Sequence, residues 1–252
     1  MKNRWMGKYM KFVDIHCHAL YGTDDGPRTD KEMYELIDAL YKDNVRYLCV
    51  TPHFHPGYFG ENSKKAIDAY RSLTEYVRSK YSDMKVYLGN ELRYNQGCVK
   101  WIKDHRCRPV NESSFILVDF HDNQPLSEII NGTNSILNAG YIPILAHVER
   151  YNRLRADARL IRELKENGVI IQVDAQSVVG EFGFFAKLRA KKLLSLHLVD
   201  IIATDSHDTN NRAPKMTECY KVIMEKQGKQ YAQRIMHDIP LAILNNNYTG
   251  RN

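Results

Sequence analysis

The sequence predicts an α/β fold in which parallel strands form a barrel-like core. Two observations predict it: short runs rich in β-branched residues alternate with longer segments of helical period, and the chain contains no repeat, low-complexity tract or linker. Such alternation is typical of parallel strands joined by crossover helices. With 252 residues, 43% of them hydrophobic, the chain can bury one full core. We therefore expect a single domain over residues 1–252.

Seven apolar runs predict the strands, which we place at residues 11–18, 46–54, 85–92, 113–121, 141–147, 169–175 and 199–207. Two segments between them, residues 30–44 and 157–168, carry apolar side chains three and four positions apart. This spacing places the apolar side chains on one face of a helix. Gly140 and Gly168 each stand just before a predicted strand, where a glycine that ends a helix is expected.

Composition excludes several classes of protein. The five cysteines form no Cys-x-x-Cys pair: Cys17, Cys49, Cys98, Cys107 and Cys219. They favour neither a disulfide framework nor a thiolate zinc site, so we expect reduced, mostly packing residues. The net charge of +6 is spread along the chain, which argues against nucleic-acid binding. No stretch approaches the roughly 18 to 20 apolar residues of a membrane span, and no signal peptide begins the sequence, so we expect a cytoplasmic protein without membrane insertion.

Metal-competent side chains stand at the C-terminal ends of six of the seven predicted strands. They are His16, His18, His53, His55, Glu91, Asp119, His121, His147, Asp205 and His207. In a parallel α/β barrel these ends open onto one face, so the side chains should converge. Side chains two positions apart in a strand share a face, which lets His16 and His18 act together, as Asp205 and His207 can. Imidazole and carboxylate ligands suit manganese, iron or zinc, and the set is large enough for more than one ion.

Each of these residues taken alone has an ordinary explanation. A single histidine at a strand end is more often a hydrogen-bonded core or surface residue than a ligand, and Asp25 would be a turn residue or a cap before a helix near Thr29. The recurrence at nearly every strand end is what favours a site. We expect the histidines in helical or loop context, His105, His197 and His237, to lie at the surface. Cys17, between two histidines, should point away from them and pack.

An ordered series of motifs resembles the PHP (polymerase and histidinol phosphatase) superfamily, most closely its bacterial tyrosine phosphatase branch of capsule and exopolysaccharide systems. The motifs are DIHCHALYGTDDG, VTPHFHPGYFG, GNEL, SSFILVDF, ILAHVERY and IIATDSHDTNNR. The resemblance implies a distorted seven-stranded β/α barrel, in agreement with the strands predicted above. It also implies a metal-dependent protein-tyrosine phosphatase that dephosphorylates an autophosphorylated bacterial tyrosine kinase and so regulates capsular or exopolysaccharide synthesis.

The resemblance further implies three metal positions, filled by manganese, with iron, zinc and magnesium as alternatives. The first would be held by His16, His18, Glu91 and Asp205, with Glu91 bridging to the second. The second would be completed by Asp119 and His147. The third would be held by Asp25, His53 and His207. The branch's catalytic phosphate-binding arginines would correspond to Arg150 and Arg212.

Two positions depart from the branch's pattern. Asp119 stands where glutamate is usual, so the second metal would be held at an altered distance or more weakly, and Val148 replaces a proline. The resemblance assigns no role to His55, which could support a ligand or contact the substrate.

Two other functions stay open from the sequence alone. One is a small-molecule phosphatase such as histidinol-phosphate phosphatase, and the other is a catalytically weak metal-binding regulator, which the departure at Asp119 would explain. A cysteine-dependent phosphatase is disfavoured, because no cysteine is followed six positions later by the arginine that those enzymes require. The sequence leaves the oligomeric state open.

Overall fold

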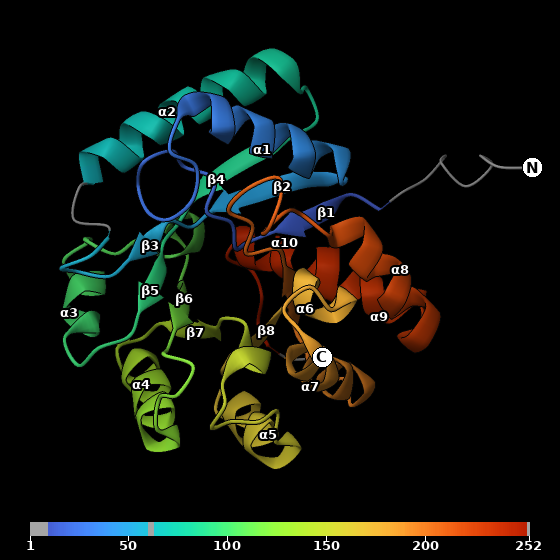
Figure 1. Cartoon of the computed structure of the whole chain (residues 1–252). Helices are drawn as coiled ribbons and strands as arrows, with labels where there is room; N and C mark the ends of the chain where they lie inside the picture. Colours follow the sequence, from blue (N-terminus) through green and yellow to red (C-terminus); the bar gives the residue numbers. More distant parts are fainter. Residues whose placement is uncertain (1–9, 60–62, 251–252) are drawn as a thin grey trace, which may run out of the picture.

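Parallel strands form the centre of the molecule and helices form its outside in the computed structural model, which describes residues 10–59 and 63–250 (Figure 1). Within these residues there are two sheets, and every neighbouring pair of strands is parallel. The three-stranded sheet has the order β1-β2-β4, with strands Phe12–Asp14, Val45–Val50 and Lys85–Leu88. The six-stranded sheet is curled and has the order β3-β5-β6-β7-β8-β9, with strands His53–Phe54, Glu91–Arg93, Phe115–Asp119, Ile142–Leu145, Ile170–Asp174 and Ile201–Ala203.

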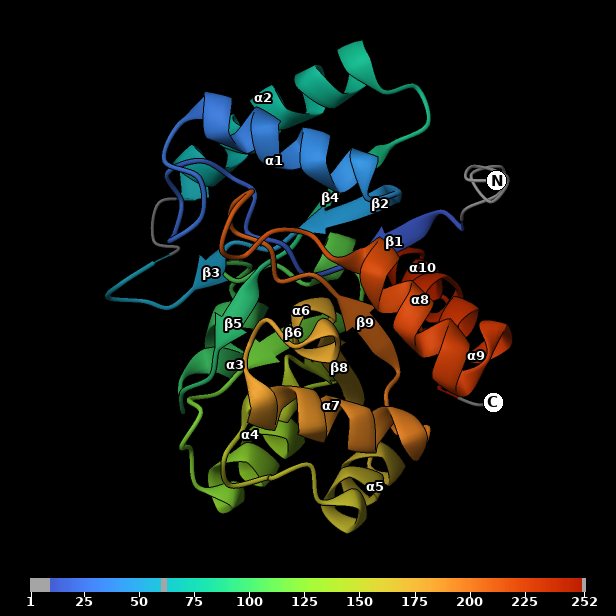
Figure 2. The ribbon, with the colours of Figure 1, turned by 45° about the vertical axis from the view of Figure 1, so that its right-hand side comes forward.

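The helices cover the sheets in groups that both views of the ribbon separate (Figures 1 and 2). Over the three-stranded sheet lie α1 (Asp30–Lys42) and α2 (Ser63–Lys80). Outside the six-stranded sheet lie α4 (Leu126–Asn138), α5 (Ala158–Glu166) and α7 (Phe184–Ser195). Beside β1 and β9 lie α8 (Met216–Gln227), α9 (Lys229–Gln233) and α10 (Ile239–Leu244). The π-helical turn η3 (Arg234–Asp238) connects α9 to α10. Shorter elements are α3 (Cys98–Lys103), α6 (Ala175–Val179) and the 3-10 turns η1 (Val110–Glu112) and η2 (Val148–Arg150). No helix in the described part of the chain is long and apolar enough to cross a membrane.

Capping residues mark the ends of three helices at the positions that the sequence predicts. The Thr29 hydroxyl accepts a hydrogen bond from the Glu32 amide at 3.2 Å and so caps α1. Gly140 and Gly168 follow α4 and α5 with φ angles of 88° and 96°. This left-handed backbone costs glycine little, which is why it ends a helix so readily. The predicted helices over residues 30–44 and 157–168 are confirmed to within a few residues.

The predicted count of seven strands is not confirmed, because two of the predicted strands are interrupted. Residues 46–54 form β2 and then β3, and residues 85–92 form β4 and then β5. Pro52, in the first interruption, has no amide to donate to a sheet ladder, and its carbonyl accepts from the Asn90 side chain at 2.9 Å. Each interruption carries the chain from the three-stranded to the six-stranded sheet. Consequently His53 and Glu91 begin strands, although the sequence places them at strand ends.

Alternate positions of the strands pack into two separate hydrophobic clusters. Ile116 and Val118 belong to the larger cluster, which the outer helices cover. Leu117 belongs to the second, which Ile239 and Ile243 of α10 complete. Because both faces are buried, the strands read in sequence as continuous apolar runs without alternation. All five cysteines are buried and free, as expected for packing residues.

The two sheets meet where β1 and β9 end. The Asp205 amide donates to the His16 carbonyl at 2.8 Å, and the His18 amide donates to the Ser206 carbonyl at 2.9 Å. Segments from the two ends of the chain therefore run side by side just beyond their strands.

Candidate metal centre

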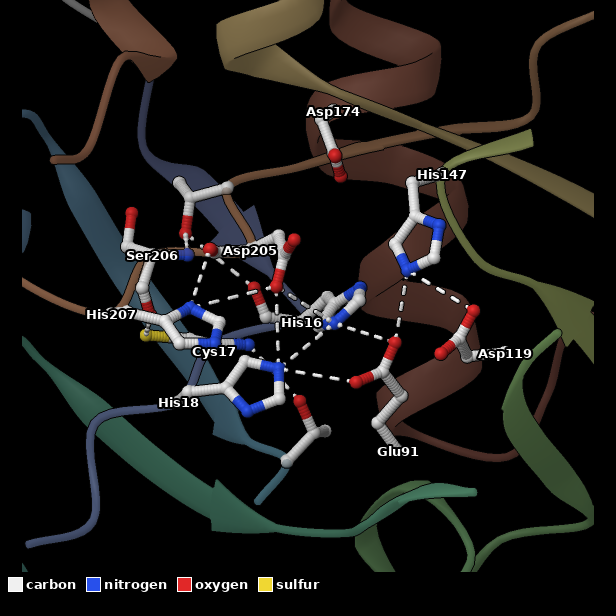
Figure 3. Close-up of polar contacts among 12 residues, drawn as sticks. His16, Cys17, His18, Glu91, Asp119, His147, Asp174, Asp205, Ser206 and His207 are labelled. Atoms are coloured by element: carbon white, nitrogen blue, oxygen red, sulfur yellow. Dashed lines mark hydrogen bonds and ion pairs between the residues drawn. The ribbon is translucent and has the colours of Figure 1, made fainter. Parts of the chain in front are cut away.

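The imidazoles of His16 and His18 point toward the carboxylates of Glu91 and Asp205 (Figure 3). Their Nε2 atoms lie 3.2 Å apart, and each lies 3.3 Å from an oxygen of Glu91 and from Asp205 Oδ1. Ligands that hold one ion at roughly 2.0 to 2.2 Å are about 3 Å from one another. His16, His18 and Glu91 form one buried group of candidate ligand atoms, and Asp205 belongs to another group with His16 and His147, so these side chains could hold a divalent cation.

A second group shares Glu91 with the first. His147 Nε2 lies 3.1 Å from Glu91 Oε1 and 3.6 Å from Asp119 Oδ1. All three side chains are buried. Since Glu91 contacts both groups, its carboxylate is placed to bridge two ions.

A third group lies toward the open side of the cluster. Asp25 Oδ1 lies 3.1 Å from His207 Nε2 and 3.4 Å from His53 Nε2, and His53 Nδ1 lies 2.7 Å from Glu91 Oε2. The loop before α1 carries Asp25, whose side chain is 49% exposed. Asp25 thus joins His53 and His207 in a group of candidate ligand atoms that also includes His18.

The structure brings together every residue that the sequence predicts as a metal ligand. Each belongs to at least one group of three or four candidate ligand atoms that lie within 4.8 Å of one another. His55 belongs to no such group; its ring stacks on Tyr58 with centroids 4.6 Å apart. His105 and His197 are exposed, as expected, whereas His237 is half-buried. His121, which the sequence predicts to converge with the other strand-end side chains, is exposed and belongs to none of these groups.

Two of the ligands have strained backbones. His147 and Asp205 have φ angles of 33° and 49°, in the left-handed region that costs a residue with a side chain conformational energy. Each follows the end of a strand, β7 or β9, where the chain must turn sharply. The His147 amide donates to Gln172 Oε1 at 3.0 Å, which helps to hold this turn.

Residues that orient the ligands were not identified from the sequence. His18 Nδ1 lies 2.7 Å from Asp24 Oδ2, which also accepts from the His53 amide at 2.9 Å. His16 Nδ1 donates to Gln172 Oε1 at 3.1 Å. Partners of this kind set the tautomer and direction of a ligating imidazole. The signal for Asp24 was present in the paired acids of the DDG motif, but nothing local indicated which acid takes which role.

Burial and the charges of neighbouring imidazoles and carboxylates shift the pKa values of the candidate ligands. Burial lowers the pKa of the His53 imidazole, but the charge of Glu91 and the hydrogen bonds of Asp25 and Glu91 together outweigh burial and raise the pKa to about 9. Burial lowers the pKa of His207 to about 4, so this imidazole is neutral and able to bind a metal. The pKa of Glu91 lies well below its usual value although burial raises it, because the charge of His16 and other imidazoles prevails. An excess of ionised carboxylate attracts protons, and a bound cation would replace them.

A cleft of about 190 Å³ opens over the cluster, and three arginines line it. Arg150 and Arg212, predicted to bind phosphate, each donate through Nη2 to Asp205 Oδ2, at 2.8 and 2.6 Å. Arg150 also pairs with Asp174. The third, Arg93, was not identified from the sequence; its Nη2 lies 2.8 Å from Asp119 Oδ2. Guanidinium groups above a metal cluster suit an anion with several oxygens, such as a phosphate.

The comparison of sequences identifies relatives over nearly the whole chain. The family model described as "Capsular polysaccharide synthesis, CpsB/CapC" matches residues 12–245. The chain is 29% identical to tyrosine-protein phosphatase CpsB of Streptococcus pneumoniae over 237 residues, covering 92% of this chain and 98% of the relative. It is 33% identical to the putative tyrosine-protein phosphatase CapC of Staphylococcus aureus over 205 residues, covering 79% and 78% of the two chains.

A solved structure has the same fold. It comes from the crystal structures of YwqE from Bacillus subtilis and CpsB from Streptococcus pneumoniae, described as unique metal-dependent tyrosine phosphatases, and matches with a TM-score of 0.86. The identity is 24%, and the match covers 94% of this chain and 95% of the other. The family that the ordered motifs resemble is therefore confirmed: this chain belongs to the CpsB/CapC family of capsular polysaccharide synthesis.

Proposed function

We propose that this protein is a metal-dependent protein-tyrosine phosphatase. The observation that carries the proposal is a cluster of buried histidines and carboxylates at the floor of a cleft that arginines line. The relatives named above as tyrosine-protein phosphatases support the same activity. Hydrolysis would consume water and a phosphotyrosine and release tyrosine and inorganic phosphate.

The three groups of ligands would each hold one divalent ion, with manganese as our proposal. The first ion would be held by His16, His18, Glu91 and Asp205; the second by Glu91, Asp119 and His147; and the third by Asp25, His53 and His207. When bound, such ions lower the pKa of a coordinated water toward neutrality and neutralise charge on phosphoryl oxygens.

The chain's own part is to bind and orient the phosphate. Arg150 and Arg212 line the cleft and each donates to Asp205, while their side chains remain 20% and 27% exposed, so part of each guanidinium group is open to the cleft. These donors are available to the oxygens of a phosphoryl group. A phenolate, whose pKa is roughly 10, leaves with less protonation than an alkoxide needs, which suits a tyrosine substrate.

The biological setting follows from the family. We propose that the substrate is an autophosphorylated bacterial tyrosine kinase, that the reaction takes place in the cytoplasm, and that it regulates capsular or exopolysaccharide synthesis. We also propose that residues 1–252 act as one domain whose two sheets together form the distorted barrel. The hydrogen bonds between the ends of β1 and β9 support this arrangement.

A panel of substrates tests the function. Manganese-loaded protein should hydrolyse a phosphotyrosyl peptide well above a phosphoseryl peptide or histidinol phosphate. Chelation should abolish turnover and manganese should restore it, whereas thiol alkylation should have little effect because all five cysteines are buried. Activity that survives exhaustive chelation would contradict the metal-dependent mechanism. A preference for histidinol phosphate would favour the small-molecule phosphatase.

A further inference from the structure

The most exposed large hydrophobic side chains of the described residues lie in two segments. One is Tyr58, which is 77% exposed. The others, which we call the α7 patch, are Phe184, Phe185 and Leu188, with exposures of 73%, 71% and 52%. Their spacing of three and four positions places them together on the first turns of α7. Single exposed apolar residues are ordinary, but a cluster of this kind indicates an interaction surface.

Residues next to the α7 patch in sequence contact the cleft and the turn beside it. The Phe182 ring, next to the patch in sequence, lies 4.1 Å from the Arg150 guanidinium carbon. Arg189 of α7 donates to the Glu149 carbonyl at 3.1 Å and to the Asn152 side chain at 3.2 Å, which fixes the helix to the η2 turn. The start of α7 thus lies beside the turn that carries Arg150, the arginine that we place over the phosphate.

Aromatic residues also lie beside His53, another residue of the cleft. His53, which lines the cleft, stacks on Phe59 with ring centroids 5.7 Å apart. Tyr58 stacks on His55 in the same short loop. Half-buried aromatic rings, Phe59 and Phe182, therefore contact His53 and Arg150 of the polar cleft, and the exposed aromatic residues follow or precede them in the chain.

The surface of α7 carries positive charge. Four basic residues and no acidic residue occur in α7: Lys187, Arg189, Lys191 and Lys192. Lys191 and Lys192 are exposed and follow Leu188 by three and four positions, so they continue the face of the patch. This surface complements a partner that carries acidic as well as apolar side chains.

We propose that the α7 patch binds the residues flanking the phosphotyrosine in an extended segment of the protein substrate. The segment carries an apolar side chain that contacts Phe184 and Phe185, and acidic residues that lie near Lys191. The inference rests on the proposed function and adds to it the chemistry of the substrate sequence. A small phosphometabolite, which ends at the cleft, leaves the patch uncovered.

The test compares a peptide with a small aryl phosphate on the manganese-loaded full chain. In the Phe184→Ser/Phe185→Ser variant, kcat/KM should fall about tenfold, mainly through KM, for a phosphotyrosyl peptide flanked by leucine and glutamate. Turnover of p-nitrophenyl phosphate should stay unchanged. The matched control, Val222→Ser/Met224→Ser, alters two α8 side chains that are each 37% exposed and should affect neither substrate. Lys191→Gln should reduce the preference for acidic over lysine-flanked peptides about two- to fivefold.

The remaining outcomes overturn the inference. Equal loss on both substrates would show that the patch only supports the cleft, and no loss on either would show that it binds no substrate. A dimer that the double variant dissociates, with peptide kinetics unchanged, would assign the patch to a second copy of the chain. A parent protein that hydrolyses p-nitrophenyl phosphate but no phosphotyrosyl peptide would also overturn it. A parent inactive on both would overturn the proposed function itself.

Discussion

For single residues, the length of each side chain sets the distances between the candidate ligand atoms of the metal centre. Most of the ligand contacts are 2.7 to 3.4 Å long, but Asp119 Oδ1 is 3.6 Å from His147 Nε2. The other oxygen of Asp119 is held by Arg93 at 2.8 Å. At the second metal position that we propose, the longest contact therefore involves Asp119, where the motif carries the shorter acid.

We predict that Asp119→Glu raises manganese occupancy or rate, because the added methylene lets the carboxylate reach further toward His147. Asp119→Ala should remove most of the activity. Metal content and kcat measured on the same preparations check both variants. Full occupancy with an unchanged rate in Asp119→Ala would mean that another residue completes this position.

The arginines contact both the ligands and the cleft. Either Arg150→Ala or Arg212→Ala should lower kcat/KM by on the order of 10²-fold, since each removes a charged donor to the phosphoryl group. Metal content should persist in each single variant, because the remaining arginine still holds Asp205. Lysine should restore activity only in part, since it keeps the charge but loses the forked geometry. Equal losses of metal and activity in a single variant would instead make that arginine a support for Asp205.

At the scale of elements, the loop between β1 and α1 depends on a close approach of backbone. A Cβ atom on Gly26 would lie 2.1 Å from the His18 carbonyl oxygen. Only glycine therefore lets this loop fold against the end of β1. The approach keeps Asp24 and Asp25 within reach of the imidazoles.

We predict that Gly26→Ala displaces this loop and weakens metal binding, with a cost in stability of about 1 to 3 kcal/mol from overpacking. Denaturant unfolding and manganese titration measure the two effects. Gly97→Ala is the matched control, because a Cβ there meets its nearest atom at an ordinary 3.4 Å. Unaltered manganese affinity in Gly26→Ala would show that the loop adapts without moving its acids.

At the scale of the whole molecule, the cluster connects segments from His16 to His207 and exists only in the folded chain. Manganese at 100 times its Kd should stabilise the fold by about 2.7 kcal/mol. For a chain of this size, this raises Tm by about 5 to 10 °C. Thermal unfolding with and without manganese measures the shift. Glu91→Gln, which removes the bridging charge, should reduce it, and an equal shift in that variant would place the stabilising ion elsewhere.

The alternation of strands and helices follows from the sequence through side-chain periodicity, a local rule. The C-terminal ends of parallel strands share a face, which indicated a cluster of metal-competent side chains, and the resemblance to a known family then indicated which of them are ligands. Thr29 and the glycines that end α4 and α5 are similarly local signals, and the structure agrees with them.

Tertiary contacts determine which residues support the ligands and which sheet each interrupted strand joins. Asp24 acts through His18 and the His53 amide, and Arg93 acts through Asp119. Which sheet each half of an interrupted strand joins depends on contacts with strands far away in the chain. These features could not be read from the sequence, because their energies come from atoms that are far apart in the chain and meet only in the folded protein.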